Sequence, residues 1–118
     1  MNKLDLVNQA WQEFEVADHL LKVTYPLFKD PKLFRGIIIN LAKSLDMAKQ
    51  LTDVPIPLLN KLNWIISFQK KCPVEFPRLD TLVMYDNRFQ LRKLTLAEVQ
   101  KYHHQTLNWL KIYLNSSR

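Results

Sequence analysis

Apolar side chains recur at intervals of three and four residues through three long stretches of this 118-residue chain. That interval matches one face of an α-helix, and it extends over residues 4–28, 31–52 and 57–71. An apolar helix face is stable only when it is buried against another element. A chain of this length can bury roughly two thirds of its unfolded surface around one core. The pattern therefore predicts a single, mainly α-helical domain over residues 1–118.

Proline and aspartate mark the ends of the first two predicted helices. Pro26 should kink or end the first helix around residues 23–25, because its ring clashes with the preceding turn. Asp30 and Pro31 then favour the start of the second helix, as its cap and its first residue.

The second predicted helix carries a wide apolar stripe. The stripe consists of Phe34, Ile37, Ile38, Leu41, Ala42, Leu45, Ala48 and Leu51. A stripe this wide implies burial against more than one neighbour, and it leaves room for a helix-to-helix contact with a second copy of the chain. Trp11, Trp64 and Trp109 each lie on a predicted helix, and we expect them to anchor the core or such an interface.

The apolar period changes to two over residues 82–91, which predicts a β-hairpin with Asp86-Asn87 as its two-residue turn. The expected register places four apolar residues on one face: Met84 opposite Phe89, and Leu82 opposite Leu91. Residues 73–81 contain two prolines and are expected to be irregular.

The last helix has the clearest start signal. Thr95 and Glu98 fit a capping box, in which each side chain accepts a backbone N–H of the other residue. The helical period continues from Val99 to Tyr113, and we expect fraying at residues 115–117. The sum is an antiparallel four-helix bundle with a short hairpin inserted before the last helix.

Composition indicates the cellular compartment in which the protein is expected. The single cysteine, Cys72, excludes an internal disulfide and is expected to be a small apolar residue at a helix end. No apolar run approaches the roughly 20 residues that span a bilayer, and the first residues lack the layout of a secretory signal. These features predict a cytoplasmic protein without membrane contact. The single glycine, Gly36, predicts few turns with positive φ.

The net charge of +6 is unevenly distributed. Residues 1–30 contain three basic and five acidic residues, whereas residues 31–118 contain fourteen basic and six acidic ones. Six basic residues lie within a short stretch, interleaved with aromatic residues: Lys70, Lys71, Arg78, Arg88, Arg92 and Lys93, with Phe76, Tyr85 and Phe89 among them. Basic and aromatic side chains together can bind a nucleic-acid strand. The alternative is a well-solvated surface.

Asp18 is the polar residue in the most unusual position, because it falls between Phe14 and Leu21 in the apolar seam of the first helix. A buried carboxylate is costly unless it is paired. Three alternatives remain open: a position at the wet edge of the seam, an ion pair with a Lys or Arg of a neighbouring helix or second copy, or a functional site. An enzyme centred on Asp18 would use His19 or His103 as its imidazole.

The histidines do not form a metal-binding pattern. His103 and His104 are neighbours that point about 100° apart on a helix, so they are poor joint ligands. A zinc site would need His19 to converge with both of them. We therefore expect no metal or cofactor, and His103 at the edge of the core.

Two segments carry a resemblance to known proteins: residues 11–33, with Trp11-Gln12-Glu13-Phe14 and Tyr25-Pro26-Leu27, and residues 73–95, with Pro73-Val74-Glu75-Phe76 before the predicted hairpin and Leu94-Thr95 after it. They resemble a group of small archaeal proteins whose layout is similar to the HEPN superfamily of helical bundles. The resemblance implies a tendency to pair and a link to RNA and nucleotide biology or toxin–antitoxin pairs.

Ribonuclease members of that superfamily carry an Arg followed by a His after four to six intervening residues. Here His19 has no preceding Arg, and Arg92 precedes His103 and His104 with ten and eleven residues between. The resemblance therefore does not extend to ribonuclease activity. The sequence predicts a non-catalytic, homodimeric interaction module. Its alternatives are an RNA- or nucleotide-binding protein that uses the basic residues of 70–93, and an enzyme around Asp18.

Overall fold

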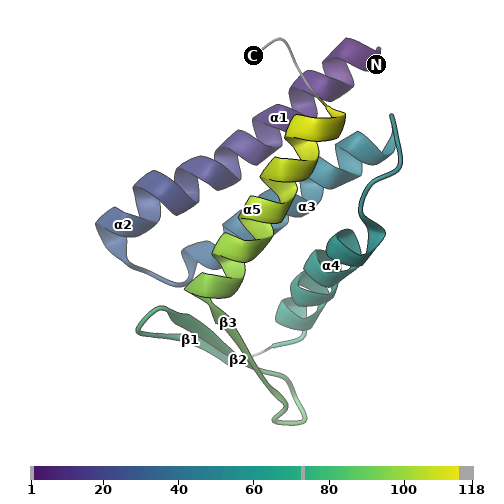
Figure 1. The fold of residues 1–118 in the computed structure, drawn as a ribbon. Coiled ribbons are helices and arrows are strands. Elements are labelled where there is room, and N and C mark those ends of the chain that lie inside the picture. The colour runs from purple at the N-terminus through teal and green to yellow at the C-terminus, as the bar shows by residue number, and fades with distance from the viewer. Residues whose placement is uncertain (1, 73, 115–118) are drawn as a thin grey trace.

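A computed structural model describes residues 2–72 and 74–114 of the chain. The first helix runs through three consecutive segments, α1 (Lys3–His19), the π-helical η1 (Leu20–Thr24) and α2 (Tyr25–Phe28). It is followed by α3 (Leu33–Lys49), α4 (Ile56–Lys70), a small sheet and α5 (Leu96–Tyr113) (Figure 1). Over the described residues, the predicted mainly helical fold with strands before the last helix is confirmed. The fraying predicted for residues 115–117 lies outside them.

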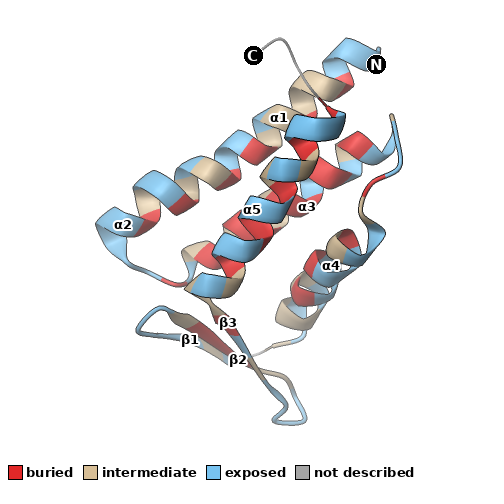
Figure 2. Ribbon diagram, in the orientation of Figure 1, coloured by how far each residue is buried: buried red, intermediate tan, exposed pale blue. Residues whose placement is uncertain are grey.

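Helix α3 lies at the centre and packs against α1, α4 and α5 (Figures 1 and 2). Its stripe is buried in full at six positions: Phe34, Ile37, Ile38, Leu41, Leu45 and Ala48. Burial of each large apolar side chain contributes about 1.5–3 kcal/mol, so this helix holds the core together. The predicted contact with more than one neighbour is confirmed, and all of these neighbours belong to the same chain.

The first helix continues past the point where Pro26 was predicted to kink or end it. At η1 the helix widens, and the N–H of Tyr25 donates to the carbonyl of Leu20, five residues earlier. Pro26 has no N–H to pair, and the wide turn makes room for its ring. The helix therefore extends to Phe28 and ends at Lys29, whose N–H donates to the Tyr25 carbonyl at 2.6 Å.

The sheet has three strands where the sequence predicted a hairpin. Strands β1 (Val74–Arg78), β2 (Thr81–Tyr85) and β3 (Leu91–Thr95) pair antiparallel in that order. The prediction of irregular structure over residues 73–81 is therefore wrong for β1, while residue 73 itself is outside the described residues. Pro77 is tolerated in β1 because the free side of an edge strand needs no ladder hydrogen bonds.

The register of the β2–β3 hairpin differs from the prediction. Tyr85 pairs with Leu91 and Leu82 pairs with Leu94. Residues 86–90 therefore connect the strands, in place of the predicted two-residue turn. The shift changes the residue that each β2 side chain faces, and with it the composition of both faces of the sheet.

The side chain of Asp86 accounts for the longer turn. Its Oδ1 accepts the backbone N–H of Arg88 at 2.9 Å and that of Gln90 at 2.8 Å. These bonds fold the five-residue loop around the carboxylate, as aspartate commonly does in turns. Phe89, which was predicted to face Met84 on the apolar side, lies instead in this loop with its side chain 85% exposed.

Alternation along the strands divides the sheet into two faces. The inner face, toward the helices, consists of Glu75, Pro77, Leu82, Met84, Arg92 and Leu94. The outer face consists of Val74, Phe76, Arg78, Thr81, Val83, Tyr85, Leu91, Lys93 and Thr95. Leu82, Met84 and Leu94 belong to the buried core, which fixes the inner face against the helices.

Three described residues adopt positive φ, and all three carry side chains: Lys29, Leu79 and Phe89. The rarity of glycine therefore does not reveal where the chain turns sharply. Gly36 serves packing instead, because a Cβ at this position would lie 3.3 Å from Leu20 Cδ1. Because Gly36 has no Cβ, α3 can approach the first helix closely.

Helix α5 begins where the sequence predicted. Thr95 Oγ1 accepts the N–H of Glu98 at 3.1 Å, which is one half of the capping box. The Glu98 carboxylate is bound elsewhere, by Arg92 at 2.8 Å and by the Tyr102 hydroxyl at 3.4 Å. Among the described residues, no helix combines the length and the apolar character needed to cross a bilayer.

Candidate nucleic-acid interface

The outer face of the sheet is a grid of three rows, each contributed by paired residues of β1, β2 and β3. The rows are Val74, Tyr85 and Leu91; Phe76, Val83 and Lys93; and Arg78, Thr81 and Thr95. Phe76 is 38% exposed, Leu91 49% and Val74 50%, whereas Val83 in the middle of the grid is buried. The sheet therefore presents apolar and aromatic side chains to solvent on the side away from the helices.

Two aromatic rings of the outer face are stacked on one another. The centroids of Phe76 and Tyr85 lie 6.1 Å apart, and the ring planes differ by 22°. Phe76 is exposed and Tyr85 half-buried, so the pair remains accessible at the surface. Stacked rings at the surface provide a flat platform for other planar groups.

Five of the six predicted basic residues are exposed, and two of them lie on the outer face. Arg78 and Lys93 are exposed and occupy two rows of the outer face. Lys71 and Arg88 together line a pocket at the β2–β3 loop. Lys70 is exposed in the last turn of α4. The side chains of these five residues have no ion-pair partner in the part of the chain that the structure describes.

Arg92, the sixth predicted basic residue, belongs to the inner face and is already engaged. Its Nη2 lies 2.8 Å from Glu98 Oε2, and its guanidinium lies 5.6 Å from the centroid of the Trp64 ring. The structure therefore separates Arg92 from its sequence neighbour Lys93, because successive strand residues point to opposite faces.

The acidic residues of the same region are used within the fold. Asp80 accepts a hydrogen bond from the Tyr25 hydroxyl at 2.6 Å, and burial together with this carboxylate raises the pKa of Tyr25 to about 12. Glu75 pairs with Arg35 and accepts from Gln69. Burial alone would raise the pKa of Glu75, but these hydrogen bonds outweigh it and lower the pKa. Of these two carboxylates only that of Glu75 has an ion-pair partner among the described residues, and the basic residues of the region still outnumber the acidic ones.

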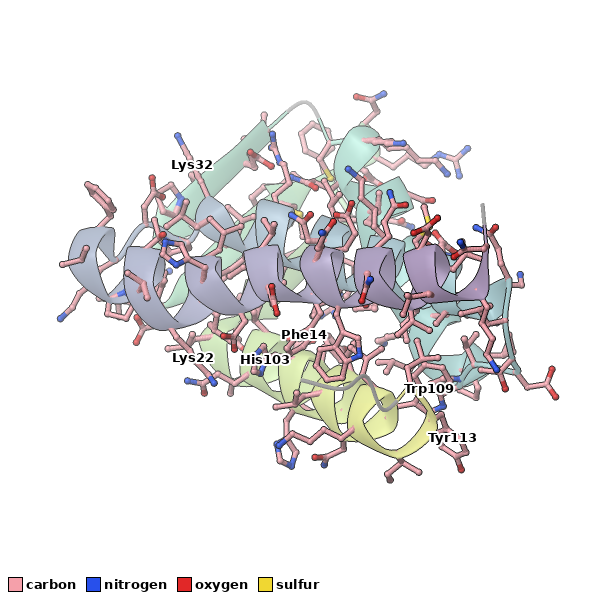
Figure 3. All side chains as sticks on the ribbon, turned by 90° about the horizontal axis from the view of Figure 1, so that it is seen from above. Phe14, Lys22, Lys32, His103, Trp109 and Tyr113 are labelled. Carbon is pink, nitrogen blue, oxygen red and sulfur yellow. The ribbon has the colours of Figure 1, made fainter. Side chains whose placement is uncertain are left out.

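Asp18 lies at the edge of the seam and is paired, which combines two of the three predicted alternatives. Its Oδ1 is 2.7 Å from Nε2 of His103 on α5 and 3.1 Å from Nζ of Lys22, and Figure 3 labels these two partners. The cross-helix partner is thus a histidine, where a Lys or Arg was expected. Burial would raise the pKa of Asp18, but hydrogen bonds from His103 and Lys22 outweigh it and lower the pKa.

His103 is buried at the edge of the core, as predicted, and its ring lies 5.0 Å from that of Phe14. An enzyme would need a cavity beside this carboxylate–imidazole pair. One hollow along α1 is lined by residues that include Val16 and His19. The Asp18–His103 pair joins α5 to the first helix.

Cys72 and His104 make local contacts within their own helices or at a helix end. Burial raises the pKa of the Cys72 thiol, whose Sγ donates to the Phe68 carbonyl at 3.1 Å. His104 is exposed and contacts Asn108. Within residues 2–72 and 74–114, no three His, Cys, Asp or Glu side chains are grouped to hold a metal ion.

Two surface features were missed by sequence reasoning. The first is β1, whose signal was the alternation of Val74, Phe76 and Arg78. The second is an open groove of ≈ 620 Å³ between α4 and α5, lined by residues that include Leu58 and Trp109. No local signal predicts this groove, because it needs two helices that are distant in the sequence.

No protein-family model matches the chain, and comparison with curated proteins and with solved structures finds no similar protein. The resemblance to the HEPN superfamily therefore stays a prediction.

Proposed function

We propose that this protein binds single-stranded RNA on the outer face of its sheet. The observation that carries the proposal is the stacked, solvent-accessible pair of Phe76 and Tyr85 beside the unpaired Arg78 and Lys93. RNA is commonly recognised through unstacked bases that lie on aromatic side chains of a sheet. Such stacking is worth about 1–3 kcal/mol per base and tolerates every base.

The charges supply the second part of the interaction. Lys93 lies in the same row as Phe76 and Arg78 in the row next to it, and each can contact a phosphate when a base lies on the rings. The nine residues of the outer face include no carboxylate, imidazole or thiol. We therefore propose binding without cleavage, and a preference for single strands, since paired bases cannot lie flat on a protein ring.

A labelled 12-nucleotide RNA tests the proposal by fluorescence anisotropy at about 50 mM and about 200 mM salt, with the RNA recovered on a gel. We expect binding that weakens with salt, with a log–log slope near −0.7 for each phosphate contacted. The recovered RNA should be intact. Absence of binding at the lower salt would overturn the proposal, and shortened RNA would contradict binding without cleavage.

A matched pair of double variants locates the surface. Replacing Arg78 and Lys93 with Ala should weaken binding about tenfold or more and reduce the salt slope, because two phosphate contacts are lost. The control replaces Lys43 and Lys49, two exposed lysines of α3, and removes the same charge. Equal weakening in both variants would show that net charge alone attracts the RNA.

Self-association, the first function predicted from the sequence, remains a second candidate. The α3 stripe that suggested it is buried within the chain, so a dimer contact has to use other residues. Ile112 and Tyr113, 69% and 60% exposed near the end of α5, favour that location. Sedimentation at increasing concentration tests it: a monomer throughout would remove this candidate, whereas a dimer lost in Ile112→Ala would support it.

A further inference from the structure

An apolar pocket opens at one end of the outer face. It has a volume of ≈ 370 Å³ and is lined by Val74, Tyr85, Asp86, Asn87 and Phe89. Two of these residues carry aromatic rings, and Tyr85 also belongs to the stacked pair described above. A pocket of this size and composition suits a planar ring more than an extended aliphatic chain.

A second, basic pocket shares a wall with the first. It has a volume of ≈ 380 Å³ and is lined by Lys71, Asp86, Asn87, Arg88 and Gln90. The shared residues are Asp86 and Asn87, at the beginning of the loop. An aromatic hollow and a basic hollow that meet at one rim match the two ends of a nucleotide, its base and its phosphate.

The basic pocket contains one carboxylate, that of Asp86, which is committed to the loop. Its Oδ1 accepts two backbone N–H groups, from Arg88 and Gln90. These donors offset part of its negative charge. Lys71 and Arg88 supply two positive charges against it, so the pocket attracts an anion.

Phe89 is held in a conformation that the fold itself does not favour. Its φ is 61°, its N–H donates to the Asp86 carbonyl at 3.1 Å, and its side chain is 85% exposed. A bulky side chain in the left-handed region is strained, and an exposed ring contributes little to the core. Strain of this kind is concentrated at ligand-binding sites.

We propose that the β2–β3 loop is a nucleotide subsite, with the base between Phe89 and Tyr85 and the adjoining phosphate at Lys71 and Arg88. This inference rests on the proposed RNA binding, and it names where one nucleotide of the strand is held. The same chemistry exists in a free nucleoside monophosphate and in a nucleotide within an RNA chain. The experiment therefore has an arm for each source.

The first arm uses RNAs that carry 2-aminopurine at successive positions, because stacking on a protein ring changes its fluorescence. We expect one position to show a large change with the wild-type protein and to lose it in Phe89→Ala. The control is Phe28→Ala, which removes another ring that is 71% exposed, at the end of α2. Loss of the signal in both variants, or in neither, overturns the subsite.

The Lys71→Ala and Arg88→Ala double variant tests the phosphate. It should weaken RNA binding about tenfold, and removal of the phosphate next to the responsive base from the RNA should weaken wild-type binding to a similar extent. If the double variant and the wild type respond equally to removal of that phosphate, Lys71 and Arg88 do not contact it and the assignment is wrong.

Phe89→Gly separates function from folding. Glycine adopts positive φ without strain, so this variant should unfold at a higher urea concentration than the wild type while losing the 2-aminopurine signal. Reduced stability together with reduced binding would mean that Phe89 supports the fold, which contradicts the subsite.

The second arm titrates adenosine monophosphate and follows the backbone NMR signals of Tyr85 and Phe89. If RNA binds and the Phe89 variants bind it like the wild type, the subsite fails and the proposed function stands. If RNA does not bind but the nucleotide shifts these signals, the proposed function fails and the loop is a site for free nucleotides. If neither ligand acts, both proposals fall.

Discussion

The two faces of the sheet belong to the same strands, but charged side chains are ion-paired on the inner face and, within the described part of the chain, unpaired on the outer face. On the inner face, Glu75 pairs with Arg35, and Arg92 pairs with Glu98 while lying over Trp64. On the outer face, Arg78 and Lys93 have no partner among the described residues. Arg92 and Lys93 are adjacent in sequence, so the difference comes from strand alternation and the packing of the helices.

The apolar residues show the same contrast. Leu82, Met84 and Leu94 of the inner face are almost fully buried, whereas Phe76 and Leu91 of the outer face are exposed to solvent. The inner face therefore packs against the helices, and the outer face leaves most of its side chains exposed to solvent.

The largest difference in stability is expected between two leucine variants, one on each face of the sheet. Leu82→Ala removes a fully buried side chain and should reduce the free energy of unfolding by about 2–5 kcal/mol. Leu91→Ala, on the outer face, should reduce it by less than about 1 kcal/mol. Urea denaturation measures both values. Similar losses would show that the outer face is also part of the core.

A smaller effect should distinguish Arg92 from Lys93. Arg92→Ala loses the ion pair with Glu98 and the contact with Trp64, and should lower stability by about 1–2 kcal/mol. Lys93→Ala should change stability by less than about 0.5 kcal/mol. RNA affinity should show the reverse order, with the larger loss in Lys93→Ala. The same order in both measurements would contradict the division of roles between the two faces.

The smallest expected effect is a pH-dependent change in stability that involves Glu75. Because the pKa of Glu75 is lowered below its ordinary value of 4.5, its contribution to stability is present above that value and is lost as pH falls through the lowered pKa. Glu75→Gln should therefore cost up to about 1 kcal/mol near pH 7 and progressively less in acid. Urea midpoints across pH check this, with Asp46→Asn, at an exposed position of α3, as the control. A cost that is independent of pH would mean that the charge of Glu75 is not involved.

The last two predicted helices agree closely with the structure. The second, predicted over residues 31–52 with Asp30 as its cap, runs instead over Leu33–Lys49 and has no side-chain cap, and the strands differ more. The start of α5 at Thr95 and the span of α4 were predicted to within about one residue, because caps and helical periodicity are local. Strand β1 was missed because its pairing with β2 depends on partners that the local pattern does not show. The hairpin register was wrong because one side chain, Asp86, lengthens the turn.

The residues of the candidate site are distributed over both faces of the sheet. The basic and aromatic residues of 70–93 were identified from composition, and the structure places Arg78, Lys93, Phe76 and Tyr85 together on one face. Arg92 belongs to the other face, and its pairing with Glu98 depends on how α5 packs against the sheet. Phe89 was assigned to the core because an alternating pattern cannot tell a strand from a loop that follows it.

The amino-acid sequence by itself determined where the helices lie, because their hydrogen bonds and caps join residues only a few positions apart. The tertiary structure alone decided which charges are paired. Asp18 meets His103 across 85 positions, and Arg35 meets Glu75 across 40. It also decided which face of the sheet is open, since helices α3 to α5 can cover only one side. Contacts between distant residues form only when the whole core assembles, so the surface left unpaired is a property of the folded chain.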